Sequence, residues 1–413
     1  MAHTASLPLP TAASVSAQRT PFGLRLGTAA FLAVWLLIAI FPLFWVMVMS
    51  FKLPVDALAS NPLQVVFGPE TRAAAGGIGI LDLVLGLLAL LAAYRLVARL
   101  TPRLARMFPA GVRPIGWIVA ALATVLLALA LVALVLPAIL GALDRLLLGV
   151  PGLGVLARPF MGATLQHYHA VWVEHQFYRN FLNSLLVTAG VVTISLSVGT
   201  LAGYALARMP SSLAFWLLIS ALIFRALPHS VLVTGYLPSF IGSRELLLPL
   251  WQAPVIGSFL QLFSAEPPTL YGQPLAVILV LVSINQPFTI WMLRSFFRSI
   301  PAELDEAARV DGCSHFQAFR RVIMPVMWPG VITTGLFSFL LAYNDYLVCA
   351  LLLDAQSQTM VPAITQYFNR ETTTTDQMEA IAAAVSITAP LFVLVMAFQR
   401  QIVSGLTAGA VKG

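Results

Sequence analysis

Residues 306–325, EAARVDGCSHFQAFRRVIMP, form a charged stretch inside a very hydrophobic chain. Of the 413 residues, 59% are hydrophobic and only 9% are charged, whereas soluble globular proteins carry about 25% charged residues. The mean hydropathy is +0.90. The composition therefore indicates an integral membrane protein, in which one long charged segment is kept out of the lipid.

The local chemistry of this stretch and its flanks predicts two short helices joined by a tight turn. Pro301 suits the first turn of a helix, where its missing N–H costs nothing. Asp311-Gly312 provides a stop, because glycine takes the left-handed conformation that follows a helix end. Ser314 and Gln317 fit a capping box that opens the second helix.

Pro325 and Pro329 are expected to end the second helix before the next membrane span. In the first helix, Ala307 and Ala308 lie beside Glu306, and their small side chains allow another surface to approach closely. By these features alone, the stretch fits a docking element and a well-capped, solvated connector equally well.

Eight segments are apolar and long enough to cross a membrane, which takes about 20 residues. They are residues 27–50, 77–97, 115–143, 181–207, 213–237, 273–294, 329–353 and 380–402. The stretch 246–263 is interrupted by Pro249 and Pro254, so we expect an interfacial or re-entrant piece there rather than a span.

The distribution of charge orients these spans. With the N-terminus in the cytoplasm, 15 of the 23 lysines and arginines fall on the cytoplasmic side, as the positive-inside rule requires. The loop ARLTPRLARMFPAGVRP, residues 98–114, lies inside only if both flanking segments cross; the alternative is that both lie flat on the membrane. The basic balance thus reflects membrane orientation, and we expect no nucleic-acid partner.

Several polar residues interrupt the apolar spans, where ionisable groups usually face a pathway or a partner. The candidates for a translocation path are Arg225, Asn285, Tyr343, Asn344 and Asp345. The alternative is that they bond to neighbouring helices and stabilise the bundle. The stretch QHYHAVWVEHQFY, residues 166–178, contains three histidines and a glutamate, but their spacing matches no metal motif and we expect no metal site.

The charged stretch also carries a family resemblance. Glu306-Ala307-Ala308, three residues, Gly312, nine residues and Val322-Ile323-Met324-Pro325 resemble the EAA loop of binding-protein-dependent ABC importer permeases; the usual ending is I-x-L-P. The flanks NQPFTIWMLRSFFRSIPAELDEAARVDG and VSGLTAGAVKG are similar to the carbohydrate-importer subfamily typified by the MalG subunit. The resemblance covers residues 22–52 and 165–413.

This resemblance implies that the loop is a coupling helix that docks on a cytoplasmic ATPase. The ATPase-coupling residues would be Glu306, Ala307, Ala308, Asp311, Gly312 and Pro325. The expected partners are two ATP-binding cassette subunits, a second MalF-like permease, an extracytoplasmic solute-binding protein and membrane lipid. The C-terminal SGLTAGAVKG either touches the ATPase or is a frayed tail.

The resemblance further implies a MetI/MalG-like core of six helices that works by alternating access. The predicted organisation is a cytoplasmic tail (1–26), a first core helix (27–52), an insertion with a transmembrane hairpin (53–165) and the remaining core (166–413), which includes the coupling loop at 295–328. The chain would sit in the inner (cytoplasmic) membrane with both termini in the cytoplasm. Its cargo would be a di- or oligosaccharide, a glycoside or a polyol.

The chain is not expected to be an enzyme. It lacks the G-x-x-x-x-G-K-[ST] phosphate loop, so ATP and Mg²⁺ would be bound by the partner ATPase and no cofactor is expected here. Neither H-E-x-x-H nor G-x-S-x-G occurs. The rival of a different class is a stand-alone ion-coupled secondary transporter, which would show inverted repeats and paired broken helices.

Overall fold

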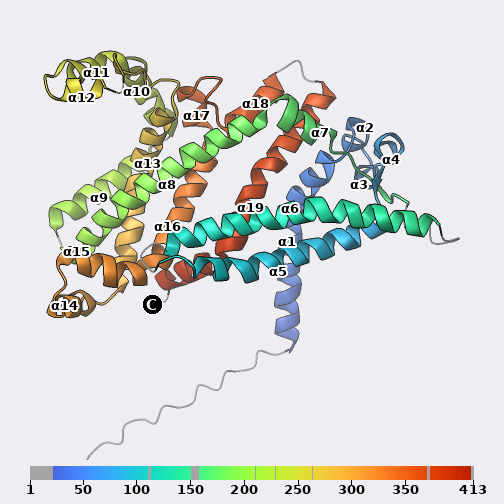
Figure 1. Ribbon diagram of the computed structural model, residues 1–413, viewed down its shortest axis with the longest axis horizontal. Helices are drawn as coiled ribbons and strands as arrows, with labels where there is room; N and C mark the ends of the chain where they lie inside the picture. The colour runs from blue at the N-terminus through green and yellow to red at the C-terminus, as the bar shows by residue number, and fades with distance from the viewer. Residues whose placement is uncertain are drawn as a thin grey trace, which may run out of the picture.

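The computed structural model describes residues 22–109, 113–149, 158–209, 211–227, 229–262, 264–369 and 373–410. Nearly all of these residues are helical (Figure 1), which confirms the all-α prediction. Because the hydrocarbon core contains no water, a spanning segment must satisfy its own backbone N–H and C=O groups, as a helix does. Strands β1 (Gly77–Ile78) and β2 (Met161–Gly162) form a small antiparallel pair outside the spans.

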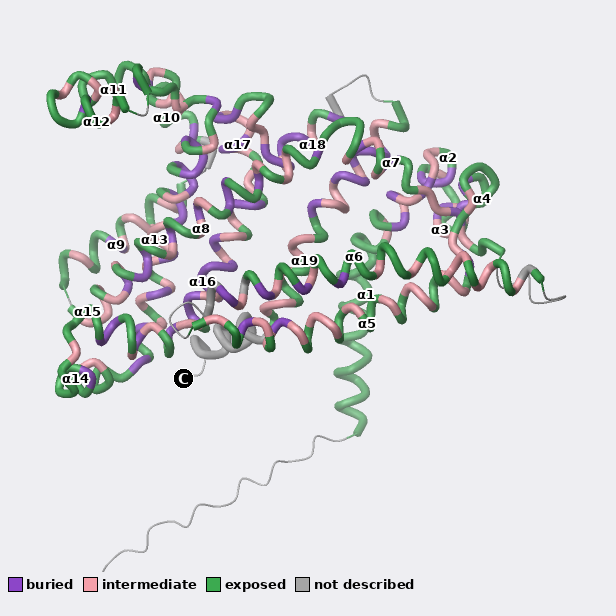
Figure 2. The backbone as a smooth tube through the Cα atoms, viewed as in Figure 1, coloured by how far each residue is buried: buried purple, intermediate pink, exposed green. Residues whose placement is uncertain are grey.

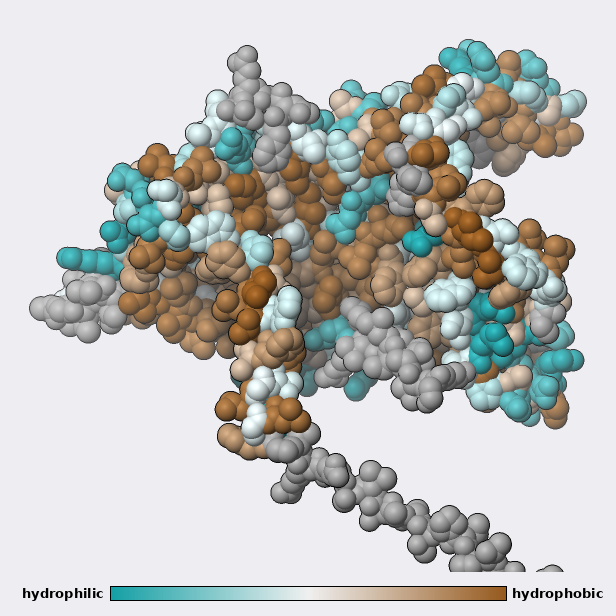
Figure 3. Space-filling model, turned by 180° about the vertical axis from the view of Figure 1, so that it is seen from behind, coloured by the Kyte–Doolittle hydropathy of each residue, from teal (hydrophilic) through white to brown (hydrophobic). Residues whose placement is uncertain are grey.

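Seven helical stretches within the described residues are long and apolar enough to cross a membrane. They are α1 (Phe22–Ser50), α5 (Ile80–Ala105), α6 (Arg113–Leu148), α8 (Phe177–Arg208), α13 (Pro274–Ser299), a continuous stretch that ends in α16 (Met324–Tyr343), and α19 (Thr374–Ala410). Hydrophobic atoms cover much of the molecular surface (Figure 3), as expected for a protein solvated by lipid.

Shorter helices form the two ends of the bundle. They are α2 (Pro54–Ala57), α3 (Pro62–Phe67), α4 (Pro69–Ala75), α7 (Gln166–His169), α9 (Ser212–Arg225), α10 (His229–Ile241), α11 (Ser243–Gln252), α12 (Ile256–Leu260), α14 (Glu303–Val310), α15 (His315–Ala318), α17 (Leu347–Leu352) and α18 (Met360–Asn369). Two π-helical turns, η3 (Ala170–Glu174) and η4 (Phe319–Ile323), continue α7 and α15.

The predicted span 213–237 is wrong as a single helix. The structure contains two shorter helices there, α9 and α10, with Ala226 and Leu227 in a turn between them. The physical reason is Pro228, because the residue before a proline is disfavoured in the α conformation. The stretch 246–263 is not a span, as predicted: it falls in α11 and α12, which project from the bundle together with α10 (Figure 1).

The most extensive contact between two helices joins α8 and α13. Glycines of α8 allow this approach: a Cβ added to Gly199 would lie 2.6 Å from Cγ2 of Thr289, and one added to Gly203 would lie 3.0 Å from the backbone nitrogen of Arg294. Small residues at such contacts let helix backbones come close in lipid. The completely buried Val187, Val191 and Leu281 fill the outer half of the interface.

Helices α5 and α6 pack mainly against each other as a hairpin. The hydroxyls of Thr101 and Thr124 lie 2.7 Å apart in its buried seam. Most of the other surface of both helices is exposed (Figure 2). Near the turn of the hairpin, the rings of Trp117 and Phe398 of α19 are 6.1 Å apart, so the hairpin is tied to the core at this end.

A compact cap of polar contacts joins the two ends of the insertion just beyond α1. Asp56, which is completely buried, accepts hydrogen bonds from the backbone N–H (2.6 Å) and the hydroxyl (2.7 Å) of Thr71. The ammonium group of Lys52 donates to the carbonyl of Gly162, and Nε2 of His167 donates to the carbonyl of Lys52 at 3.1 Å. Burial raises the pKa of the Asp56 carboxyl, but the hydrogen bonds from Thr71 and Gln64 outweigh it and hold the pKa below its usual value.

We predict that Asp56→Ala lowers the free energy of local unfolding of residues 53–75 by about 2–4 kcal/mol, because two buried donors of Thr71 lose their acceptor. Hydrogen exchange of this segment measures the effect. The Glu70→Ala variant, which removes an exposed carboxylate from the same cap, should change it by less than about 0.5 kcal/mol. Because the folded pKa of Asp56 is depressed, its contribution is present at neutral pH and is lost as the pH falls below about 4. Equal effects of the two variants would contradict this role of Asp56.

Candidate functional site

The charged stretch forms the two short helices that its sequence predicts. Helix α14 ends at Val310, and Gly312 follows with φ of +88°, the left-handed conformation that favours glycine. Ser314 then caps α15: its hydroxyl accepts from the backbone N–H of Gln317 at 3.3 Å, and the Gln317 side chain accepts from the backbone N–H of Ser314 at 2.9 Å. The predicted turn and capping box are both confirmed.

The prediction that Pro325 and Pro329 end the second helix is wrong. Helix α15 continues through the π-helical turn η4 into α16, so His315–Tyr343 is one continuous helical stretch. Pro325 follows directly after the π-helical turn η4, so its missing backbone N–H falls where the regular hydrogen-bond pattern of the helix is already interrupted. The second helix of the loop is therefore the beginning of a membrane span.

One side of α14 is fastened to the end of α8. The carboxylate of Asp305 accepts a hydrogen bond of 2.6 Å from the hydroxyl of Tyr204 and one of 2.7 Å from Nε of Arg208. The Arg208 and Asp305 side chains are only 16% and 14% exposed, so water competes little with this ion pair. Arg208 also donates to the carbonyl of Ile300 at 3.1 Å, which holds the start of the loop against α8.

Three aromatic rings pack together beside this ion pair. The ring of Tyr204 lies 5.5 Å from that of Phe297 at the end of α13 and 4.8 Å from that of Phe319 in η4. Such ring pairs add to the stability that burial already provides. The cluster brings together the inner ends of α8, α13 and the continuous helix that begins at α15, so α14 is rigidly attached to three helices of the bundle.

The opposite side of α14 is exposed. Glu303, Glu306, Ala307 and Val310 follow the i, i+3, i+4, i+7 spacing of one helix face, and all four are exposed. Ala308 is buried, and Asp311 and Gly312 are exposed in the turn. Apolar groups remain uncovered nearby, since Val310 is 88% exposed and Phe316 is 64% exposed. The six residues predicted for coupling are thus gathered at one end of the molecule, mostly on its surface.

The candidates for a translocation path are not gathered in one place. Asn285 is buried in α13 and donates to the hydroxyl of Ser338 in α16 at 2.7 Å. Tyr343 is buried and donates to the carbonyl of Ile387 in α19 at 3.1 Å. Both side chains therefore join neighbouring helices in this conformation, and a contact with cargo stays a prediction.

The remaining path candidates lie at helix ends. The guanidinium of Arg225, at the end of α9, stands 4.8 Å from the centre of the Phe288 ring. Asp345 accepts from the backbone N–H of Val348 at 2.8 Å and so caps α17, while Asn344 donates back to the carbonyl of Leu340 at 3.0 Å. The span predicted to run to residue 353 consequently ends at Tyr343.

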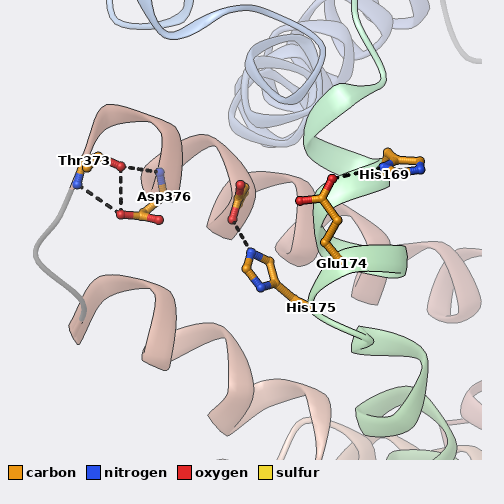
Figure 4. Close-up of polar contacts among 6 residues, drawn as sticks. His169, Glu174, His175, Thr373 and Asp376 are labelled. Atoms are coloured by element: carbon orange, nitrogen blue, oxygen red, sulfur yellow. Dashed lines mark hydrogen bonds and ion pairs between the residues drawn. The ribbon is translucent and has the colours of Figure 1, made fainter.

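The histidines of residues 166–178 stabilise the outer end of the bundle. Nδ1 of His169 lies 3.3 Å from the Glu174 carboxylate, and Nε2 of His175 lies 3.0 Å from that of Glu379 in α19 (Figure 4). Asp376 and Thr373 form a separate cap at the start of α19. No group of three or more potential metal ligands occurs among the described residues.

Sequence reasoning missed the most important contact of the site. Asp305, Tyr204 and Arg208 were not predicted as site residues. Tyr204 and Arg208 are four residues apart at the end of a span, so they share a helix face. That spacing is the only local signal, and it does not identify the acid on which both converge.

The sequence of the chain is similar to those of known transport proteins. The family described as "Binding-protein-dependent transport system inner membrane component" matches residues 196–407, just over half of the chain. The diacetylchitobiose uptake system permease protein DasC of Streptomyces coelicolor is 33% identical over 252 residues, which are 60% of this chain and 81% of DasC.

Two further relatives match the chain to a similar extent. The trehalose transport system permease protein SugB of Mycobacterium tuberculosis is 33% identical over 251 residues, 60% of this chain and 82% of SugB. The trehalose/maltose transport system permease protein MalG of Thermococcus litoralis is 30% identical over 253 residues, 61% of this chain and 82% of that protein.

We predict that Asp305→Asn weakens the attachment of α14. The ion pair with Arg208 is lost and only a hydrogen bond from the guanidinium to an uncharged amide oxygen can remain, so the local unfolding free energy of residues 303–310 should fall by about 1.5–3 kcal/mol. Hydrogen exchange of α14 measures this loss. Glu303→Gln, on the exposed face of the same helix, is the matched control and should leave protection unchanged; a similar loss in both variants would show that the ion pair does not anchor α14.

Proposed function

The chain belongs to the family of binding-protein-dependent transport system inner membrane components, and from this we propose that it is the permease subunit of an ATP-driven importer that brings a carbohydrate into the cytoplasm. The cargo would be a di- or oligosaccharide, a glycoside or a polyol. Support for this class comes from the printed names of DasC, SugB and MalG, which handle diacetylchitobiose, trehalose and trehalose/maltose. Because the chain belongs to this family, the alternative of a stand-alone ion-coupled transporter is rejected.

The observation behind the proposal is that the two sides of α14 differ. One side is fastened through Asp305, and the other presents Glu306, Ala307 and Val310 to the surroundings. A short helix with an exposed face of small and apolar residues suits a groove on a cytoplasmic ATPase. The ATPase pair would bind ATP and Mg²⁺, since this chain has no phosphate-loop sequence.

The attachment of α14 suggests how closure of the ATPase pair would reach the membrane. A displacement of α14 is transmitted to α8 through the Asp305–Arg208 ion pair and to α13 through Tyr204 and Phe297. It also reaches α16, because α14 packs against η4 and His315–Tyr343 is continuous. Packed elements with such contacts move as rigid bodies rather than deform, so the bundle would alternate between inward-open and outward-open arrangements.

The remaining partners follow from the same proposal. A second, MalF-like permease would complete the translocation path, and an extracytoplasmic solute-binding protein would deliver the carbohydrate at the end opposite α14. The chain would lie in the inner membrane, which its seven apolar helical stretches support. That both termini lie in the cytoplasm is part of the proposal.

We predict that mild-detergent purification of the full chain from its native membrane brings with it an ATP-binding cassette ATPase and a second permease. Uptake of the carbohydrate into vesicles should require ATP and the binding protein, and it should persist when ion gradients are collapsed. A chain that supports uptake driven by an ion gradient without ATP would refute the proposed function.

We also predict that Glu306→Lys reduces copurification of the ATPase and carbohydrate uptake by about tenfold or more, because it reverses the charge at the centre of the exposed face of α14. The side chain is exposed, so membrane insertion and yield should stay unchanged. Glu70→Lys, the same change on the cap at the other end, is the control and should behave as wild type. Normal ATPase binding by Glu306→Lys would contradict the docking role of α14.

A further inference from the structure

The inserted hairpin carries a row of unpaired positive charge. Helix α5 contains Arg95, Arg99 and Arg103, and Arg106 is the residue that follows its end. Their spacings of four, four and three residues place them on one face. We refer to these four residues as the arginine stripe; it is about 16 Å long at 1.5 Å per residue. All four are exposed, and none forms an ion pair or a hydrogen bond with another described residue.

The packing of the hairpin holds the stripe away from α6. Thr101 and Ala105, on the other side of α5, are 3% and 2% exposed, and the Thr101 hydroxyl contacts that of Thr124 in α6. The hairpin also has no acid near the stripe in its sequence, because no aspartate or glutamate occurs between Asp82 and Asp144. The positive charge is therefore available to a ligand from outside the chain.

The same face of α5 is apolar toward the start of the helix. Val84, Leu88 and Leu91 precede Arg95 at helical spacing, and they are 51%, 55% and 47% exposed. An apolar segment that passes into a basic one along a single face matches an amphiphile, with acyl chains along the first part and an anionic headgroup on the second. A soluble anion would contact only the arginine side chains and would leave the apolar residues of this face uncovered.

The stripe lies at the same end of the bundle as α14. The turn of the hairpin is close to the C-terminal half of α19, as the contact of Trp117 with Phe398 requires, and α15 lies at this end as well (Figure 1). If α14 docks on a cytoplasmic ATPase, which is the proposed function, the stripe faces the cytoplasmic leaflet. Anionic phospholipids of that leaflet attract basic segments beside a transmembrane helix.

We propose that the arginine stripe, together with the apolar face of α5 that precedes it, binds anionic phospholipid. The guanidinium groups hold the headgroup phosphate by charge-assisted, bidentate hydrogen bonds. The acyl chains cover Val84, Leu88 and Leu91, which the core leaves exposed. The hairpin thereby links the permease to a layer of negatively charged lipid, and the assignment of the leaflet rests on the proposed function.

The test uses the full chain purified with its partners in mild detergent and titrated with phosphatidylglycerol or phosphatidylcholine, with bound lipid counted by native mass spectrometry. Arg99→Gln combined with Arg103→Gln keeps Arg95 and Arg106 to orient the hairpin. One arginine near an anionic surface contributes about 1 kcal/mol, or about fivefold in affinity. The double variant should therefore bind phosphatidylglycerol about 25-fold more weakly and phosphatidylcholine as before.

Two controls sharpen the comparison. Arg99→Lys with Arg103→Lys keeps the charge and should retain most of the affinity. Arg72→Gln with Arg158→Gln removes two exposed arginines near the cap and should have no effect. The proposal is overturned if the glutamine variant binds phosphatidylglycerol like wild type, if inorganic phosphate displaces the lipid at equal concentration, or if the variant loses a copurifying protein instead of lipid. Lipid binding and ATPase copurification are separate measurements, so absence of the ATPase with intact lipid binding would refute only the proposed function.

Discussion

The close contact between α8 and α13 sets the geometry on which the functional end of the molecule depends. Gly199 and Gly203 let the two backbones approach, and this brings the last turn of α8 beside the loop that follows α13. Tyr204 and Arg208 can then reach Asp305. A larger residue at either glycine would press on Thr289 or on the backbone of Arg294, so the position of α14 depends on the close packing of these two helices.

The charged loop shows how a membrane protein holds an element firmly outside its apolar spans. The ion pair of Asp305 with Arg208 is largely shielded from water, the aromatic rings beside it are packed, and the second helix of the loop is the first part of a membrane span. These contacts fix α14 to three helices of the bundle. If α14 docks on an ATPase as proposed, a displacement of α14 would act on all three helices.

The inserted hairpin lies outside the part of the chain that matches the family, residues 196–407. It is joined to the core mainly at its turn and exposes most of its apolar surface. Its two helices meet through a buried threonine pair. The remaining surface of α5 includes the exposed face on which the proposed lipid site lies.

Much of this protein is determined by the sequence alone. Long apolar runs identify the membrane helices because a span has to bury its backbone polar groups within itself, and the Asp311-Gly312 stop and the Ser314–Gln317 capping box are local interactions between neighbouring residues. The EAA pattern could be recognised for the same reason, since all its residues lie within one short segment; the coupling role that it implies stays a prediction. The sequence failed where the outcome depended on competing local signals: Pro228 divides a predicted span, whereas Pro325 and Pro329 do not end a helix.

Only the tertiary structure decided which distant residues meet. Asp305 pairs with Arg208 across 97 positions of the chain, and Asn285 bonds to Ser338 across 53. No period or motif links such residues, because their contact depends on how closely two helices pack and how each is rotated about its axis. The sequence thus determined the helices and the loop between them, and the packing of those helices determined which side of the loop is fastened and which side is free to bind a partner.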